Sequence, residues 1–271
     1  MGYSNFKRIV WSTQIQHGLS KHLVFKDDCD FKFEGEVKNG QKVKVLGVGK
    51  PTVGDYTGEK IGGPETVADT SVYLEITEAK YFNFQVDDVD KSQSVDGLME
   101  ALMEEATRAV AEEADAFCAE DMAKNCGTTT QSLAITTKAQ AKVAVDTAFT
   151  TLWNDGVKFN DKVTIYITPW FYNLFKDYLI ETKTDNDKLM ANGIIGCYNN
   201  AQIKMTNNIF NDGTDDHMVI KTSKAYAFAT GIDQVEAYRP DELFSDAVKG
   251  LCTYGGKMVR PKESYCIKAH N

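Results

Sequence analysis

The chain has 271 residues, a hydrophobic content of 42% and a formal net charge of −9. At this length roughly three quarters of the unfolded chain's surface is buried on folding, so one large domain or two modest ones form without disulfide bridges. The negative charge argues against a protein that coats nucleic acid, because such proteins displace counterions with cationic side chains.

Cysteine spacing and hydropathy indicate the cellular compartment in which the protein folds. The six cysteines include no CxxC pair, and only four histidines accompany them, which argues against a zinc site. No uninterrupted apolar run reaches the length of a signal peptide or of a membrane span. These features favour reduced thiols and a protein that folds in a cytoplasm, with no membrane partner.

The charges are unevenly distributed along the chain. Residues 1–26 contain four basic residues and no acid, whereas residues 95–125 contain nine acids against two bases. We expect these two segments to attract each other, within or between subunits. The first 25 residues mix apolar and polar side chains without a clean period, which favours an arm that becomes ordered on another surface. A strand or helix packed on its own domain is an equal alternative.

A β pattern follows this arm. Asn39-Gly40 has the chemistry of a tight hairpin turn, and six glycines between residues 47 and 63 favour an adaptable loop over a regular element. On either side, apolar residues alternate with polar ones, which predicts strands. The alternating positions are Phe31, Phe33, Val43, Val45, Val72, Leu74, Ile76, Phe82, Phe84 and Val86. The sequence therefore predicts strands flanking a long glycine-rich excursion, a projecting β-arm.

After Ser94 the apolar residues recur at the spacing of an α-helix. A helix over residues 95–125 would be about 45 Å long at 1.5 Å per residue, and it would end before Gly127. We expect its carboxylates to lie away from the apolar stripe. The stripe consists of Leu98, Leu102, Ala106, Val110, Ala114, Phe117 and Met122, with Met99 and Met103 beside it.

The second half is typical of a separate α/β unit. Its predicted elements are a helix over residues 137–154, a buried strand over 163–167, a helix that opens at Pro169, and strands at 202–205 and 218–221 joined through a turn at 211–213. The last forty residues predict further strands. We expect their sheet partners in the first half, so that the chain leaves one domain and returns to it.

Two short strings carry a resemblance. Residues 79–91 read AKYFNFQVDDVDK, and residues 49–56 read GKPTVGDY. Both strings, in a projecting β-arm followed by a long acidic helix, resemble the major capsid proteins of tailed phages, whose shared architecture is the α+β Hong Kong 97 coat fold. The likeness is strong at sequence level between about Val43 and Asp121, and the C-terminal half matches by pattern.

The resemblance implies a domain plan. Residues 1–30 would form the N-terminal arm and residues 31–130 the peripheral domain, with an extended loop at about 40–80 and a spine helix at about 95–125. Residues 131–235 would form the axial domain, and residues 236–271 would return to the peripheral domain. The implied assembly is a homo-oligomer of hexamers and pentamers that encloses DNA without sequence-specific binding. The further partners implied are a portal, decoration proteins and either a separate scaffolding protein or none. The implied location is the virion, assembled in the host cytoplasm.

Local motifs give little support to catalysis. Residues 47–50 fail the phosphate-loop pattern, since Pro51 follows the lysine. Asp215-Asp216-His217 follows a turn sequence, so we interpret it as a solvated hairpin turn rather than a metal or general-base site. Asp87, Asp88 and Asp90 lack the ligand spacing of a calcium loop. We therefore expect no catalytic residue, no metal and no cofactor.

The predicted functional residues are contacts between subunits. Multiple weak contacts, made by arms that a compact globule lacks, suit the assembly of a closed shell. The residues predicted to make these contacts are Lys7, Arg8, Trp11, Lys21, Lys50, Asp55, Tyr56, Glu59, Glu104, Glu105 and Glu112. Two alternatives stay open: a cellular nanocompartment shell of the same fold, and a soluble α/β enzyme.

Overall fold

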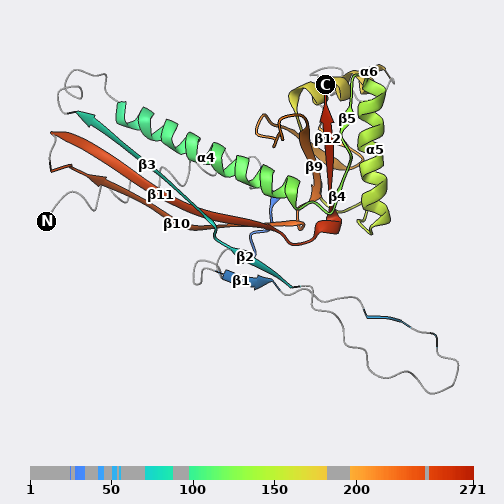
Figure 1. Cartoon of the computed structure of the whole chain (residues 1–271), viewed down its shortest axis with the longest axis horizontal. Coiled ribbons are helices and arrows are strands. Elements are labelled where there is room, and N and C mark those ends of the chain that lie inside the picture. Colours follow the sequence, from blue (N-terminus) through green and yellow to red (C-terminus); the bar gives the residue numbers. More distant parts are fainter. Residues whose placement is uncertain are drawn as a thin grey trace.

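The structure is a computed structural model that describes residues 25, 28–33, 42–45, 51–53, 55, 71–87, 98–181, 196–241 and 244–271. Figure 1 shows an elongated body, here called the long lobe, beside a compact lobe. The long lobe contains β3 (Glu78–Asp87), α4 (Leu98–Lys124), β10 (Tyr226–Tyr238) and β11 (Ser245–Met258). The compact lobe contains β4 (Thr128–Thr129), β5 (Leu133–Ala134), α5 (Lys138–Asn154), β6 (Val163–Ile167), α6 (Pro169–Glu181), β7 (Cys197–Tyr198), β8 (Ala201–Met205), β9 (Asp216–Thr222) and β12 (Ser264–His270), with the 3₁₀ turn η2 (Pro261–Glu263) before β12.

Helix α4 forms where the apolar stripe predicts it. Its buried side faces the long sheet, and both Met103 and Met122 are fully buried there. Burying one such side chain contributes about 1.5–3 kcal/mol. The expectation that the carboxylates avoid this side is wrong for Asp115, which is 1% exposed. The helix ends within two residues of the predicted stop, with Lys124 in its last turn, where a cation suits the helix dipole.

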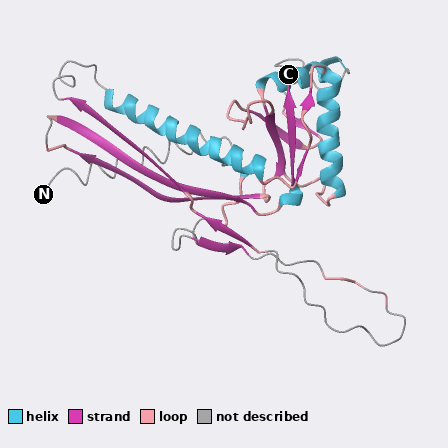
Figure 2. Cartoon of the chain, in the orientation of Figure 1, coloured by secondary structure: helices cyan, strands magenta, loops and turns pink. Residues whose placement is uncertain are grey.

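The long sheet has the strand order β10-β11-β3, all antiparallel. Because side chains alternate across a strand, Tyr226 and Phe228 of β10 join the core under α4, whereas Ala227 and Ala229 belong to a core on the opposite face. Figure 2 shows α4 on one side of these strands and two short strands on the other. The pairing of β11 with β3 confirms that the chain returns to the sheet of its first half.

The two short strands are β1 (Lys42–Val45) and β2 (Val72–Glu75), here called the arm root. They pair antiparallel, as expected for strands flanking an excursion, with Lys42 opposite Glu75. Leu74 is completely buried against β10. At the crossing, a Cβ on Gly255 of β11 would lie 2.0 Å from the carbonyl oxygen of Glu75, so only glycine fits there. The arm root is therefore packed on the long sheet.

The compact lobe is built on a sheet of order β4-β12-β9-β6-β8-β7, with β5 also paired to β12. Strand β6 is buried throughout, and α6 opens at Pro169, both as predicted. Helix α5 begins after Thr137, whose side chain accepts a hydrogen bond from the backbone N–H of Gln140, while the Gln140 side chain bonds back in a capping box. α5 and α6 cover one face of the sheet with a shared core.

Three predictions about strand partners are wrong. Residues 264–270 form β12 in the compact sheet, although the domain plan returned residues 236–271 to the first domain. Residues 226–235 belong to the long sheet, although the plan assigned them to the axial domain. Strands β8 and β9 do not pair with each other, because β6 lies between them. Partners of short strands are set by distant segments, which local periodicity does not record.

The predicted strand at Phe31 and Phe33 is also wrong. Asp30 makes an isolated bridge to Ala227, and the chain then turns at residues 32–33. Phe31 packs against the core under α4, and Phe33 packs against the core of the arm root. Their alternation arises because this short connector passes between two cores.

Candidate assembly surfaces

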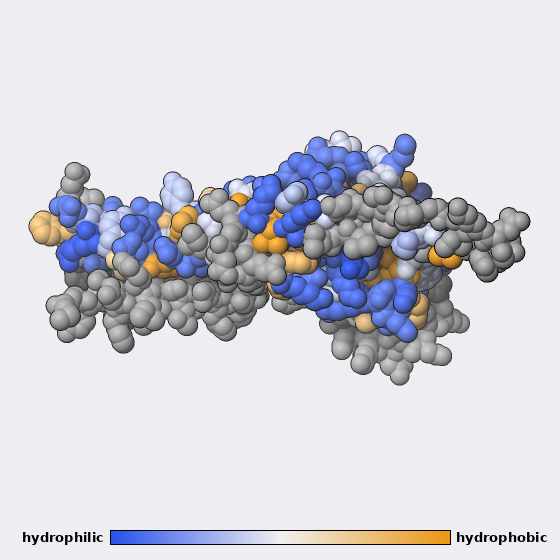
Figure 3. All heavy atoms as spheres, turned by 90° about the horizontal axis from the view of Figure 1, so that it is seen from below, coloured by the Kyte–Doolittle hydropathy of each residue, from blue (hydrophilic) through white to orange (hydrophobic). Residues whose placement is uncertain are grey.

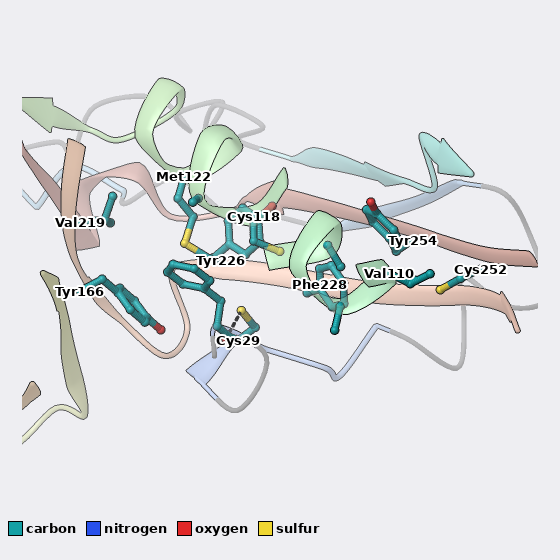
Figure 4. Packing of buried hydrophobic residues seen from close by; sticks show 14 of the residues in the cluster. Cys29, Val110, Cys118, Met122, Tyr166, Val219, Tyr226, Phe228, Cys252 and Tyr254 are labelled. Atoms are coloured by element: carbon teal, nitrogen blue, oxygen red, sulfur yellow. Dashed lines mark hydrogen bonds between the residues drawn. The ribbon is translucent and has the colours of Figure 1, made fainter. Parts of the chain in front are cut away.

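The two lobes share one hydrophobic core. Tyr166 and Val219 of the compact lobe belong to the same cluster as Met122 and Cys118 of α4, and Figure 4 shows these side chains together. Phe25 lies against Tyr166, with ring centroids 4.3 Å apart. The segment around residue 28 therefore reaches the point where the lobes meet.

Asp28 is the centre of a buried polar cluster at this junction, here called the Asp28 clamp. Its carboxylate is 1% exposed and lies 2.7 Å from Nζ of Lys204 and 3.1 Å from Nζ of Lys162. The hydroxyl of Tyr166 donates to it at 3.1 Å, and the fully buried Lys221 donates to its backbone carbonyl at 2.7 Å. All four partners come from the compact lobe.

Two residues further on, the same segment holds the long lobe. The backbone N–H of Asp30 donates to the carbonyl of Tyr226 at 2.9 Å, and the N–H of Phe228 donates to the carbonyl of Asp30 at 3.3 Å. Residues 28–30 thus make hydrogen bonds and ion pairs with both lobes. They connect the lobes in addition to the places where the chain itself passes from one lobe to the other. Sequence reasoning missed this clamp, although the lone Lys221 in a buried strand was a signal.

Electrostatics favour an ionised carboxylate in the clamp. Burial alone raises the pKa of Asp28, but its hydrogen bonds and proximity to Lys204 and Lys162 outweigh burial and hold the pKa below the usual value. Burial also lowers the pKa of Lys221. The clamp therefore stabilises the fold when Asp28 is charged.

The outward side of α4 is an acidic face. The predicted contact residues Glu104, Glu105 and Glu112 are all exposed there. Arg108 lies between them and forms ion pairs with Glu112 at 3.0 Å and Glu105 at 3.9 Å. Glu113 lies 3.4 Å from Lys80 of β3. Part of the acidic charge is therefore compensated within the subunit, and the face stays negative.

Most other predicted contacts lie outside the described residues. Asp55 is described and exposed. The remaining predicted contacts beyond the described ranges are Lys7, Arg8, Trp11, Lys21, Lys50, Tyr56 and Glu59. Their roles stay predictions.

The turn expected before Asp215 forms and is exposed at residues 211–214, but the expectation of a solvated turn is wrong for Asp215 and His217. Gly213 does adopt a positive φ of 96°, as a tight turn requires, but Asp215 and His217 are 5% and 7% exposed. His217 lies 3.1 Å from Asp212, and His270 of β12 lies 2.6 Å from Asp215. The loop folds back and holds the last strand. Within the described ranges, no group of three or more His, Cys, Asp or Glu residues is placed to bind a metal.

The architecture has counterparts among solved structures. The chain is 29% identical to a protein of Mycobacterium phage Che8, with a TM-score of 0.80 and 90% of each chain covered. Its fold also matches the capsid structure of the cyanophage P-SCSP1u, at 14% identity and a TM-score of 0.71, over 86% of this chain and 84% of the other. The chain is a phage major capsid protein.

The capsid protein has the α+β fold of the Hong Kong 97 type, and its role is structural, in the shell of the virion. The fold extends to a virus-like particle from Pyrococcus furiosus, at 12% identity and a TM-score of 0.62, over 98% of this chain and 100% of the other. No protein family profile and no curated protein matches the sequence. Among the helices described for the capsid protein, none is long and apolar enough to cross a membrane.

Proposed function

We propose that this capsid protein assembles as hexamers and pentamers into an icosahedral head shell around a double-stranded DNA genome, without a catalytic step. The observation that carries the proposal is the likeness to the Che8 protein over 90% of both chains. The shape supports it, because a long lobe with a laterally placed arm root offers contact area on several sides of the subunit. We further propose assembly in the host cytoplasm, with a separate scaffolding protein, a portal and decoration proteins as partners.

The contacts proposed for this assembly use the basic arm and the acidic face. Of residues 1–30, the part that precedes the Asp28 clamp acts as the arm, and Lys7, Arg8 and Lys21 lie across α4 of the same or a neighbouring subunit. The exposure of Glu104 and Glu112 supports this arrangement, since both carboxylates face outward on one side of α4. Replacing the three basic residues with glutamate should weaken the shells in a salt-dependent way, because exposed ion pairs are screened by salt. Shells of equal stability at every salt concentration would refute the contact.

The extended loop is the second proposed contact. Lys50, Asp55, Tyr56 and Glu59 reach a neighbouring subunit from the end of the arm root. The exposure of the described residues 51–53 and 55, with Val53 at 88%, supports this role. Deleting residues 49–63 should leave a folded subunit, by circular dichroism, that assembles poorly. Normal closed shells from this variant would contradict the assignment.

The content of the particle tests the function. The full chain is expressed and purified, and particles are imaged by negative-stain electron microscopy. The purified chain should form closed shells. In a separate sample, virions isolated from infected cells should contain this chain as the main shell protein and hold nuclease-protected DNA. The likeness to the virus-like particle from Pyrococcus furiosus favours one rival, a nanocompartment shell that holds a protein. A protein cargo in place of DNA would establish this rival, and a small discrete oligomer at every concentration would exclude both.

A further inference from the structure

Within the described ranges the chain passes between the two lobes at three places after the Asp28 clamp, and these crossings lie close together. They are residues 125–127 before β4, 223–225 before β10 and 259–263 before β12. The backbone N–H groups of Val259 and Arg260 donate to the carbonyl of Ala225 at 2.8 and 3.1 Å. The backbone N–H of Gly127 donates to the hydroxyl of Ser264 at 3.2 Å. The three crossings therefore form one narrow connection between the lobes.

The Asp28 clamp joins the lobes at a different part of the compact sheet. The crossings adjoin β4, β12 and β9, which are neighbours in the strand order β4-β12-β9-β6-β8-β7. The clamp partners Lys221, Tyr166 and Lys204 belong to β9, β6 and β8. From β12, the middle strand of the first group, to β6, the middle strand of the second, is two strand spacings, or about 10 Å. The clamp is therefore a brace placed to one side of the connection.

The clamp fixes the orientation of the lobes more sharply than their shared core does. Contacts between apolar side chains such as Met122 and Val219 have no preferred direction, so they tolerate a small turn. Hydrogen bonds hold only within a narrow range of distance and angle. The Asp28 carboxylate, which is 1% exposed, receives such bonds from Lys204 at 2.7 Å and from Tyr166 at 3.1 Å. A turn of one lobe would leave these buried groups without partners, which is costly.

A small opening of the clamp corresponds to a large movement of the lobes. If one water molecule separated Asp28 from its partners, a gap of about 2.8 Å on a lever of about 10 Å would turn the compact lobe by about 16°. The 27 residues of α4 span about 40 Å, so the far end of the long lobe would move by about 11 Å. Figure 3 shows from below how the long lobe extends to the left of the compact lobe.

We propose that Asp28 is a positioning residue for assembly: the clamp fixes the angle between the lobes and thereby sets the curvature and the diameter of the shell. This proposal rests on the shell-forming function. A closed shell forms only when the contacts on each subunit meet at angles that close. A subunit with neighbours on both lobes passes the angle between its lobes on to the angle between those neighbours. A loosened brace therefore gives subunits of several angles and shells of several diameters.

The diameter of the shells tests the proposal. Asp28→Ala removes the carboxylate from the clamp. Leu152→Ala is the matched control, because it empties a fully buried site in the core under α5 and destabilises the compact lobe away from the junction. In electron micrographs, the unaltered chain and the control should give one dominant diameter. Asp28→Ala should place about a tenth of the shells in other size classes, because a tenfold weaker preference raises a minor state from about 1% to about 10%.

The possible results separate the clamp from the shell function. A single diameter for Asp28→Ala would overturn the role of the clamp and leave the shell function standing. An equal spread of diameters from both variants would also overturn it, because lost stability would then explain the spread. Several diameters from the unaltered chain would overturn it as well. No shells from the unaltered chain would overturn the shell-forming function itself.

A distance measurement in the free subunit covers the case in which Asp28→Ala does not fold or assemble. Asp28→Asn keeps the size of the side chain and an acceptor for Tyr166 but removes the charge. Spin labels are attached at exposed positions of the two lobes, through Glu104→Cys and Thr150→Cys in a chain with Cys197→Ser.

Double electron–electron resonance should give one narrow distance when the clamp is intact. With Asp28→Asn the distribution should widen by up to about 8 Å, the shift of position 104 for a 16° turn about the end of α4. Equal distributions with and without the charge would overturn the proposal.

Discussion

Replacing Asp28 with alanine tests whether the Asp28 clamp holds the two lobes together. The change removes the acceptor of the Tyr166 hydroxyl and the counter-charge of Lys204, which is 21% exposed. Breaking a buried ion pair by removing one partner costs about 3–5 kcal/mol. Because Lys162 is 59% exposed and regains water, we expect the lower end of this range, about 3 kcal/mol of unfolding free energy.

Urea unfolding of the unassembled subunit, followed by circular dichroism, measures this loss. Lys162→Ala is the matched control, since it removes an exposed partner of the same carboxylate and should cost less than about 1 kcal/mol. Asp28→Asn keeps an acceptor for Tyr166 and should fall between the two. An Asp28→Ala variant no less stable than Lys162→Ala would refute the clamp.

The clamp also predicts a pH dependence. Although burial opposes ionisation, Lys204 and Lys162 hold the pKa of Asp28 below its usual value. The contribution of the carboxylate is therefore fully present above about pH 4, the pKa of an unfolded aspartate, and is lost as the pH falls through the lower folded pKa. The stability difference between the unaltered chain and Asp28→Asn should shrink below pH 4. A constant difference down to pH 2 would contradict the electrostatic explanation.

Three further substitutions probe other contacts. Gly255→Ala places a Cβ against the carbonyl of Glu75 and should destabilise the subunit by about 1–3 kcal/mol in urea unfolding, whereas a neutral effect would refute the close crossing. Leu74→Ala empties a fully buried site in the arm root and should cost about 2–5 kcal/mol, again by urea unfolding. The hydrogen bond with His270 holds the pKa of Asp215 below its usual value, and Asp215→Asn removes the carboxylate that makes this bond. Hydrogen exchange of β12 should therefore speed up at pH 7, and the difference from the unaltered chain should disappear as the pH falls below 4 through the lowered folded pKa. Unchanged exchange at pH 7 would show that the loop does not hold the strand.

The sequence predicts elements with a long period or a strong local signal. The acidic helix and the start of α6 at Pro169 were both placed to within a few residues, because a helical stripe and a proline are local features. The arm root was predicted from alternation on both sides of a glycine-rich segment, and β1 does pair with β2. The two strings at residues 49–56 and 79–91 indicate the family without any knowledge of contacts.

Long-range partners could not be predicted. β12 and β11 have similar alternation, yet β11 joins the long sheet and β12 joins the compact one, because Tyr265 and Ile267 fit the core under α5. The Asp28 clamp joins residues from four distant parts of the chain, and no spacing rule connects them. The turn at residues 211–214 is solvated as its composition predicts, but the adjoining Asp215 and His217 are buried next to β12.

The pairing of β11 with β3 has a consequence for the order in which the subunit is made. During synthesis, β3 has no strand partner until α4, all of the compact lobe except β12, and β10 have left the ribosome. Non-local pairing of this kind is slow, so the long sheet is among the last parts to form. The arm root packs on β10 and β11 of that sheet, and it therefore has no surface to rest on before then. A nascent chain thus has no organised arm root until β11 has been made.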